Sequence, residues 1–110
     1  MELIERGSHY ILTPNIQSIT EKDVKTIDNT VTKLKKPVVI DMNGIYSCVN
    51  SFYYLLKKLG NMTLINPESD LLTTLFITGF DKYVKIFTEE VSLEDNSRAL
   101  INRKFSVVNK

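Results

Sequence analysis

Hydrophobic and polar residues follow two different periods along the chain. Residues 2–12, ELIERGSHYIL, contain two short runs of alternating apolar and polar residues, joined around Arg6, Gly7 and Ser8. Alternation with a period of two is typical of strands, and the joining residues favour a turn, so this segment predicts a β-hairpin. Pro14 ends the second run because proline cannot donate a hydrogen bond to a neighbouring strand.

Residues 20–34 change to a helical period. Thr20 and Asp23 have the spacing of a capping box, in which each side chain accepts from the backbone N–H of the other residue. The apolar residues that follow at helical spacing are Val24, Ile27, Val31 and Leu34. Pro37 then forces the chain out of a helix.

The rest of the chain alternates short apolar segments with helical ones. Strands are predicted at VVIDM, MTLIN and YVKIF, which are residues 38–42, 62–66 and 83–87. Helices are predicted over residues 50–60, with Asn50 as N-cap and Gly60 as the stop, and over residues 69–79, with Ser69 as N-cap and Gly79 at the end. A last helix is predicted over residues 92–104, where Ser92 and Asp95 form a second capping box.

This order of elements predicts an α/β sandwich. Strands separated by helices need right-handed crossovers, which produce a mostly parallel central sheet, here of about five strands with about four helices. The hairpin adds an antiparallel edge strand at the N-terminus. Residues 38–42 are almost wholly apolar, so we expect that strand to be covered on both faces.

Composition adds few constraints. A chain of 110 residues is long enough for one hydrophobic core, and we expect a single domain over residues 1–104 followed by a tail over residues 105–110. Lys and Arg (14) nearly cancel Asp and Glu (13), whereas nucleic-acid-binding domains usually carry a basic excess. We therefore expect no nucleic acid as a partner.

The sequence also suggests a compartment. The first ten residues, MELIERGSHY, are too polar for a signal peptide, and no apolar run approaches the roughly 20 residues that span a bilayer. A single cysteine excludes an internal disulfide, as is common in a reducing environment. We expect a cytoplasmic protein without a membrane span; the oligomeric state stays open.

The residues that could take part in chemistry lie at the end of the strand over residues 38–42 and in the segment after it. Asp41 precedes an Asn-Gly turn, and Cys48 is either a small core residue or a thiol activated by the following helix. Asn50 fits an N-cap, and Ser51 is either a solvated first-turn serine or a phosphorylation site stabilised by the helix dipole. No spacing of His, Cys, Asp or Glu indicates a metal, no glycine-rich phosphate loop is present, and no catalytic set can be assembled, so we expect neither an enzyme nor a cofactor.

The helix over residues 50–60 has two distinct faces. The residues on its apolar face are Phe52, Leu55, Leu56 and Leu59, with Tyr53 beside them. We expect Leu56, and Phe76 in the helix over residues 69–79, to be core residues. Tyr54, Lys57 and Lys58 fall on the opposite face, where they are either an anchor for an acidic partner or an ordinary solvated surface.

Three segments together resemble the STAS domain of bacterial anti-sigma factor antagonists. VVIDMNGIYSCVNSFYYLLKK is similar to the family's strand, polar turn and second helix, NMTLINPESDLLTTLFITGF to the next strand, loop and helix, and DKYVKIFTEEVSLEDNSRAL to the last strand and closing helix. The likeness covers residues 36–101 and, more faintly, residues 8–34. Its most specific residues are Leu75, Thr78, Gly79, Phe80, Ile86 and Phe87.

The resemblance implies a non-enzymatic regulator that binds an anti-sigma factor or serine-kinase-like protein and is inactivated by phosphorylation of a serine at the start of the second helix. The family's acidic residue, phosphoacceptor, second hydroxyl and small residue fall on Val49, Asn50, Ser51 and Phe52. Val49 lacks the acid and Asn50 lacks the hydroxyl. The family's Gly and Asp of the first loop fall on Pro14 and Gln17, so a second acid is also missing.

The resemblance and the residues lead to two expectations. The first is an antagonist-like protein that docks without phosphorylation at position 50; the alternative is a STAS-like structural subunit of a larger complex, such as a lipid-transport ATPase or a stress-signalling assembly. The resemblance also suggests that Asp41 braces its loop through a hydrogen bond. In both cases the expected partner-binding residues are Tyr46, Cys48, Val49, Asn50, Ser51, Tyr54, Lys57 and Lys58.

Overall fold

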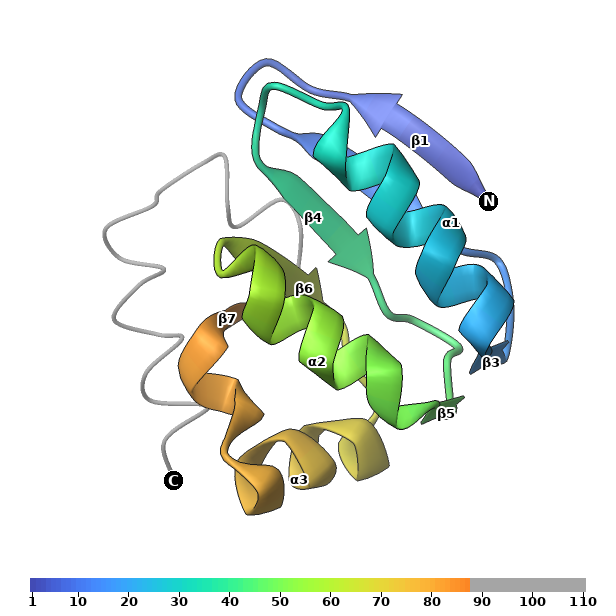
Figure 1. The fold of residues 1–110 in the computed structure, drawn as a ribbon, viewed down its shortest axis with the longest axis vertical. Helices are drawn as coiled ribbons and strands as arrows, with labels where there is room; N and C mark the ends of the chain where they lie inside the picture. Colours follow the sequence, from blue (N-terminus) through green and yellow to red (C-terminus); the bar gives the residue numbers. More distant parts are fainter. Residues whose placement is uncertain (88–110) are drawn as a thin grey trace.

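A mixed five-stranded sheet forms the centre of the molecule (Figure 1). The computed structural model describes residues 1–87, so the helix predicted over residues 92–104 and its capping box lie outside the described residues. The strand order is β1-β2-β4-β6-β7. These strands are β1 (Glu2–Glu5), β2 (Tyr10–Thr13), β4 (Val38–Asp41), β6 (Met62–Ile65) and β7 (Val84–Phe87).

The N-terminal hairpin is antiparallel and the rest of the sheet is parallel. β1 pairs with β2 with Leu3 opposite Leu12, and the Arg6 N–H donates to the His9 carbonyl at 2.7 Å to close the turn. β2, β4, β6 and β7 pair in parallel with one another. The predicted α/β class, the mostly parallel sheet of five strands and the antiparallel edge strand are therefore confirmed.

Three α-helices pack on one face of this sheet. They are α1 (Glu21–Thr32), α2 (Asn50–Leu59) and α3 (Ser69–Thr78), and the short 3-10 helix η1 (Phe80–Tyr83) follows α3. In Figure 1, β4 is seen between α1 and α2, and these two helices contact each other. About four helices were predicted; the part of the chain that the structure describes contains three, and the fourth falls beyond it.

The predicted helix ends are right at three positions, and two predicted N-caps are wrong. The capping box of Thr20 and Asp23 is formed, and Gly60 and Gly79 end their helices in the left-handed region. The N-cap of α2, however, is Val49 rather than Asn50, because a hydrogen bond of 3.0 Å from its N–H to the Ile19 carbonyl holds Val49 extended.

The second wrong N-cap is at α3. Glu68 is the N-cap in place of Ser69, and neither Glu68 nor Val49 caps its helix with a side-chain hydrogen bond. The Glu68 carboxylate instead accepts from the Gly44 N–H at 3.1 Å, in the loop after β4. Both helices therefore begin where a tertiary hydrogen bond holds the preceding residue, and not at the residue with the best capping side chain.

Apolar side chains from the sheet alternate between two clusters. Val38 and Ile40 face the helices, whereas Val39 points to the opposite face, where it packs with Ile11, Ile65 and Phe87. The expectation that the strand over residues 38–42 is covered on both faces is thus confirmed.

Two residues that were expected in the core differ in their burial. Leu56 is fully buried, as expected. Phe76 was expected in the core but is only partly buried at its margin, because α3 directs Leu71 and Leu75 inward, four residues apart on one face.

Candidate functional site

An unpredicted pair of short strands joins the loops that precede α1 and α2. β3 (Ser18–Ile19) and β5 (Ser47–Cys48) pair in parallel, and the Tyr46 N–H extends this pairing to the Gln17 carbonyl at 2.8 Å. We call residues 17–19 and 46–49 the seam. Strands of two residues carry no recognisable alternation, so sequence patterns could not indicate them.

Side chains strengthen the connection between the two loops. The hydroxyls of Ser18 and Ser47 bond to each other across the seam. The Ser51 hydroxyl, in the first turn of α2, donates to the Glu21 carboxylate in the first turn of α1 at 2.8 Å. The first turns of the two helices are therefore held together by a direct bond.

The loop between β4 and the seam is braced from within. The Asp41 carboxylate accepts from the Asn43 N–H at 3.0 Å, which matches the loop-bracing role expected of Asp41. Gly44 adopts a positive φ of 81°, which completes the Asn-Gly turn. Together with the Gly44–Glu68 bond, these contacts fix the loop that leads to Tyr46.

Cys48 behaves as a core residue and not as an activated thiol. It is partly buried against the helix side of the core, and burial raises the pKa of its thiol to about 12. Burial likewise raises the pKa of the neighbouring Tyr53 hydroxyl to about 12. A thiol with so high a pKa carries almost no thiolate at neutral pH, which disfavours the redox alternative.

The outer face of α2 is oriented as the periodicity predicts. The Tyr54 side chain is 62% exposed, and Lys57 and Lys58 are also exposed. Tyr53 lies on the inner side, only 6% exposed. Lys58 is not free for a partner, because its ammonium forms an ion pair of 3.1 Å with Asp28 of α1.

Tyr54 belongs to a group of packed rings that sequence analysis did not predict. This aromatic cluster consists of Tyr53, Tyr54, Phe80 and Tyr83. Phe80 contacts the other three rings, with centroid distances of 5.8 Å to Tyr53, 5.3 Å to Tyr54 and 6.3 Å to Tyr83. The only advance signal was Phe80, directly after the glycine that ends α3, with Tyr83 three residues further along the chain.

A lysine completes the edge of the aromatic cluster. The Lys57 ammonium lies 5.3 Å from the centre of the Tyr83 ring, in cation–π geometry. Tyr83 is 39% exposed, and Tyr54 itself is 62% exposed. The surface around Tyr54 therefore combines exposed apolar area with one positive charge.

The predicted partner-binding residues fall into two groups along α2. Tyr46, Cys48, Val49, Asn50 and Ser51 lie at the seam and the first turn, and Tyr46 and Asn50 are exposed there. Lys57 and Lys58 lie near the far end, since eight residues of helix separate Asn50 from Lys58 by about 12 Å. Tyr54 lies between these two groups along the helix.

The described residues offer no group of three or more His, Cys, Asp or Glu side chains that could hold a metal ion. Among residues 1–87, no helix has the length and apolar character needed to cross a membrane.

Comparison with known proteins adds no relative. No family model matches the chain, and a search of curated proteins found no match.

Proposed function

We propose that this chain is a STAS-like, non-enzymatic binding domain that docks on an anti-sigma factor or a related serine-kinase-like protein. The docking surface is formed by Tyr46, the first turn of α2, and the exposed part of the aromatic cluster. Docking is independent of phosphorylation at position 50.

The observation that supports this proposal most is that Tyr54 is packed against Phe80 and is nevertheless exposed. Binding normally loses free energy when mobile side chains are ordered at an interface. The ring of Tyr54 is already held edge-on against Phe80, yet 62% of the residue is accessible. Tyrosines of this kind are frequent among the residues that dominate protein–protein affinity.

The rigid loops next to this surface support a role in recognition. The seam, the Ser51–Glu21 bond and the Asp41-braced turn hold Tyr46 and the first turn of α2 in one arrangement. Interfaces that bind without reorganisation use such prearranged loops. The mixed sheet with an antiparallel edge strand is also the architecture that the resemblance implies.

The surroundings of Ser51 argue against a displaced phosphorylation switch. Asn50 has no hydroxyl group, and the Ser51 hydroxyl already donates to Glu21. A phosphate on Ser51 would gain from the N-terminus of α2 but would face the carboxylate of Glu21 at close range. The loss of the acid at position 49 and of the hydroxyl at position 50 therefore fits a domain without the family's switch.

The charges around Tyr54 indicate an acidic partner surface. Lys57 keeps its ammonium exposed beside Tyr83, whereas Lys58 is paired with Asp28. Rim charges of this kind mainly affect the rate of association and its dependence on salt. Lys57 is therefore the lysine expected to attract the partner.

The direct test uses the full chain as bait in extracts of its source cells, followed by identification and purification of the retained protein. A nucleotide-binding anti-sigma kinase that binds wild type and loses at least about 2 kcal/mol of binding free energy with Tyr54→Ala supports the proposal. Lys57→Ala should slow association at low salt, and Lys25→Ala on the exposed side of α1 is the matched control that should not.

Three results would overturn the proposal. One is retention of a transport ATPase subunit instead of a kinase, which is the outcome expected of a structural subunit. Another is equal binding by wild type and Tyr54→Ala. The third is a phosphate on Ser51, detected by intact mass after incubation with the purified kinase and ATP, because it would restore a phosphorylation-controlled antagonist.

A further inference from the structure

Strand β1 forms an exposed edge of the central sheet (Figure 1). Among the described strands it pairs only with β2, and every residue of β1 is exposed. Leu3 is 40% exposed and Ile4 is 37% exposed, although both are aliphatic. An exposed edge strand carries N–H and C=O groups on which another strand can pair. The opposite edge of the sheet is β7, which contacts η1, so the β1 edge is separate from the proposed docking surface.

The hairpin determines which backbone groups of β1 point outward. The Arg6 N–H donates to the His9 carbonyl, so the backbone N–H and C=O groups of Arg6 face β2. In an antiparallel pair these groups alternate sides along the strand, so those of Ile4 also face β2. The N–H and C=O groups of Leu3 and Glu5 therefore point away from the sheet, where a second strand can bind them.

The side chains along this segment divide between the two faces of the sheet. Ile4 lies opposite Ile11, which belongs to the apolar cluster on the face opposite the three described α-helices. Glu2 and Arg6 are each two residues from Ile4, so they share its face. That face of the edge therefore presents a negative, an apolar and a positive side chain in order along the chain.

This order is self-complementary when two copies pair antiparallel about Ile4. Ile4 then lies opposite Ile4 of the second copy, and Glu2 of each copy lies opposite Arg6 of the other. Leu3 of each copy lies opposite Glu5 of the other, so their outward N–H and C=O groups bond to one another. A shift of one residue would leave these groups unbonded, and a shift of two would place a charged side chain opposite Ile4.

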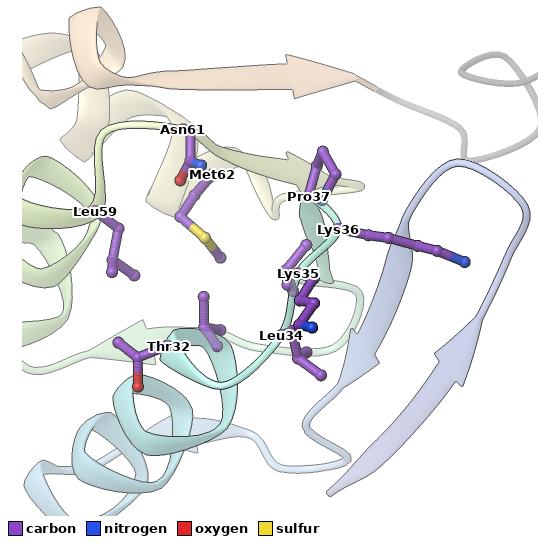
Figure 2. A pocket seen from close by; sticks show the side chains of 10 residues that line it. Thr32, Leu34, Lys35, Lys36, Pro37, Leu59, Asn61 and Met62 are labelled. Atoms are coloured by element: carbon purple, nitrogen blue, oxygen red, sulfur yellow. The ribbon is translucent and has the colours of Figure 1, made fainter.

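The charged residues at this edge are compatible with such pairing. The Glu5 carboxylate forms an ion pair of 2.6 Å with the Lys36 ammonium, and Figure 2 shows Lys36 extending toward the β1–β2 hairpin. Glu5 therefore keeps its own counter-ion when Leu3 of a second copy lies beside it. Arg6 has an interaction within its own chain, but a guanidinium has five N–H donors and can bind a second carboxylate.

We propose that two copies of this chain associate through β1 and join their central sheets into one continuous sheet. The pairing is antiparallel and centred on Ile4, whose side chains connect the apolar clusters of the two copies. A Glu2–Arg6 pair flanks this contact on each side. Only residues 2–6 of each copy take part, which is much less than a standard interface, so we expect a weak dimer.

Sedimentation velocity of the full chain over a concentration series tests this association. Wild type should change from monomer to dimer as the concentration approaches about 1 mM, and no larger species should form because the pairing closes the edge. Glu2→Arg and Arg6→Glu should each weaken the dimer about tenfold, since each places like charges opposite one another in both flanking pairs. Lys25→Glu, on the exposed side of α1, changes the net charge as much as Arg6→Glu and should not weaken the dimer.

A mixture of the two charge variants provides the sharpest measurement. In the mixed dimer, the arginine introduced at position 2 lies opposite the glutamate introduced at position 6. The native Arg6 and Glu2 of the two chains also lie opposite each other. The mixture should therefore associate about as strongly as wild type, although each variant alone does not.

Leu3→Pro tests the backbone pairing independently of charge. It removes an outward N–H and leaves the hydrogen bonds to β2 in place, and proline is tolerated at such edge positions. The variant should melt near the wild-type temperature and should remain monomeric at about 1 mM.

Wild type that stays monomeric up to about 1 mM would overturn the proposal. The same holds if the mixed charge variants associate no more strongly than either one alone, or if folded Leu3→Pro still dimerises. A dimer that is lost in Tyr54→Ala and retained in both charge variants would place the contact at the docking surface instead.

Discussion

The ring of Tyr54 stands nearly perpendicular to that of Phe80, with their centroids 5.3 Å apart and an interplanar angle of 85°. This edge-to-face contact joins the exposed face of α2 to η1, which follows α3. Phe80 also contacts the buried ring of Tyr53, so one side chain links the core to the proposed docking surface.

Phe80→Ala should destabilise the protein more than Tyr54→Ala. Phe80 is partly buried and packs against three rings, and its removal should cost roughly 1.5–3 kcal/mol through the loss of both burial and ring contacts. Tyr54→Ala should cost about 0.5–1.5 kcal/mol, the contribution of one aromatic pair. Urea denaturation of both variants measures the difference; a greater loss in Tyr54→Ala would mean that Tyr54 belongs to the core.

Leu75 and Ile77 provide a sharp test of the orientation of α3. Leu75 is 1% exposed and Ile77 is 79% exposed, although both are aliphatic and only two residues apart. Leu75→Ala should lower the free energy of unfolding by about 2–5 kcal/mol. Ile77→Ala should change it by less than about 0.5 kcal/mol. Similar losses at both positions would show that α3 does not direct Leu75 toward the core and Ile77 toward solvent.

Thr20→Ala should remove the capping box of α1 and cost about 1 kcal/mol. The same capping box makes the free energy of unfolding depend on pH in the acidic range. Hydrogen bonds from the Thr20 N–H and hydroxyl lower the pKa of Asp23 below its ordinary value of 3.8. The stabilisation is therefore present above pH 3.8 and is lost as the pH falls through the lower pKa of the folded state.

A matched variant tests the contribution of Asp23 to this pH dependence. Asp23→Asn removes the titrating group, so the stability difference from wild type should be constant at neutral pH and should narrow as the pH falls below 3.8. Urea midpoints measured across this range provide the comparison. A difference that does not change with pH would mean that Asp23 is not bonded in its ionised form.

Cys48 should react slowly with iodoacetamide at pH 8 in the native protein and quickly in urea. The pKa of its thiol rises from 9.0 to about 12 on folding, because burial disfavours the thiolate. The unfolded chain therefore loses this proton first as the pH rises, and stability should decline between pH 9 and pH 12.

Cys48→Ala separates the thiol from other alkaline effects. Tyr53 also has its pKa raised, from 10.0 to about 12, so part of the alkaline decline should remain in the variant. Rapid alkylation of native wild type at pH 8 would contradict the buried position of Cys48.

The sequence by itself determined the order of the five strands of the central sheet and of the three α-helices in residues 1–87, and most of the helix ends. Its local patterns were sufficient because periodicity, the Thr20 capping box and the glycines at positions 60 and 79 act within a few residues of chain. The almost wholly apolar run in β4 likewise predicted burial on both faces of the sheet. The outward position of Tyr54 followed from the helical period of α2 alone.

Tertiary structure decided the features that depend on residues far apart in the chain. The seam depends on backbone pairing between Ile19 and Cys48. Strands of only two residues have no sequence pattern from which such pairing could be predicted. The same pairing made Val49 the N-cap of α2, against the preference for Asn50. The aromatic cluster formed because the fold places η1 beside α2, bringing Phe80 to Tyr54. α3 is apolar on several sides, so only packing against the sheet could select Leu75 for the core and leave Phe76 at its margin.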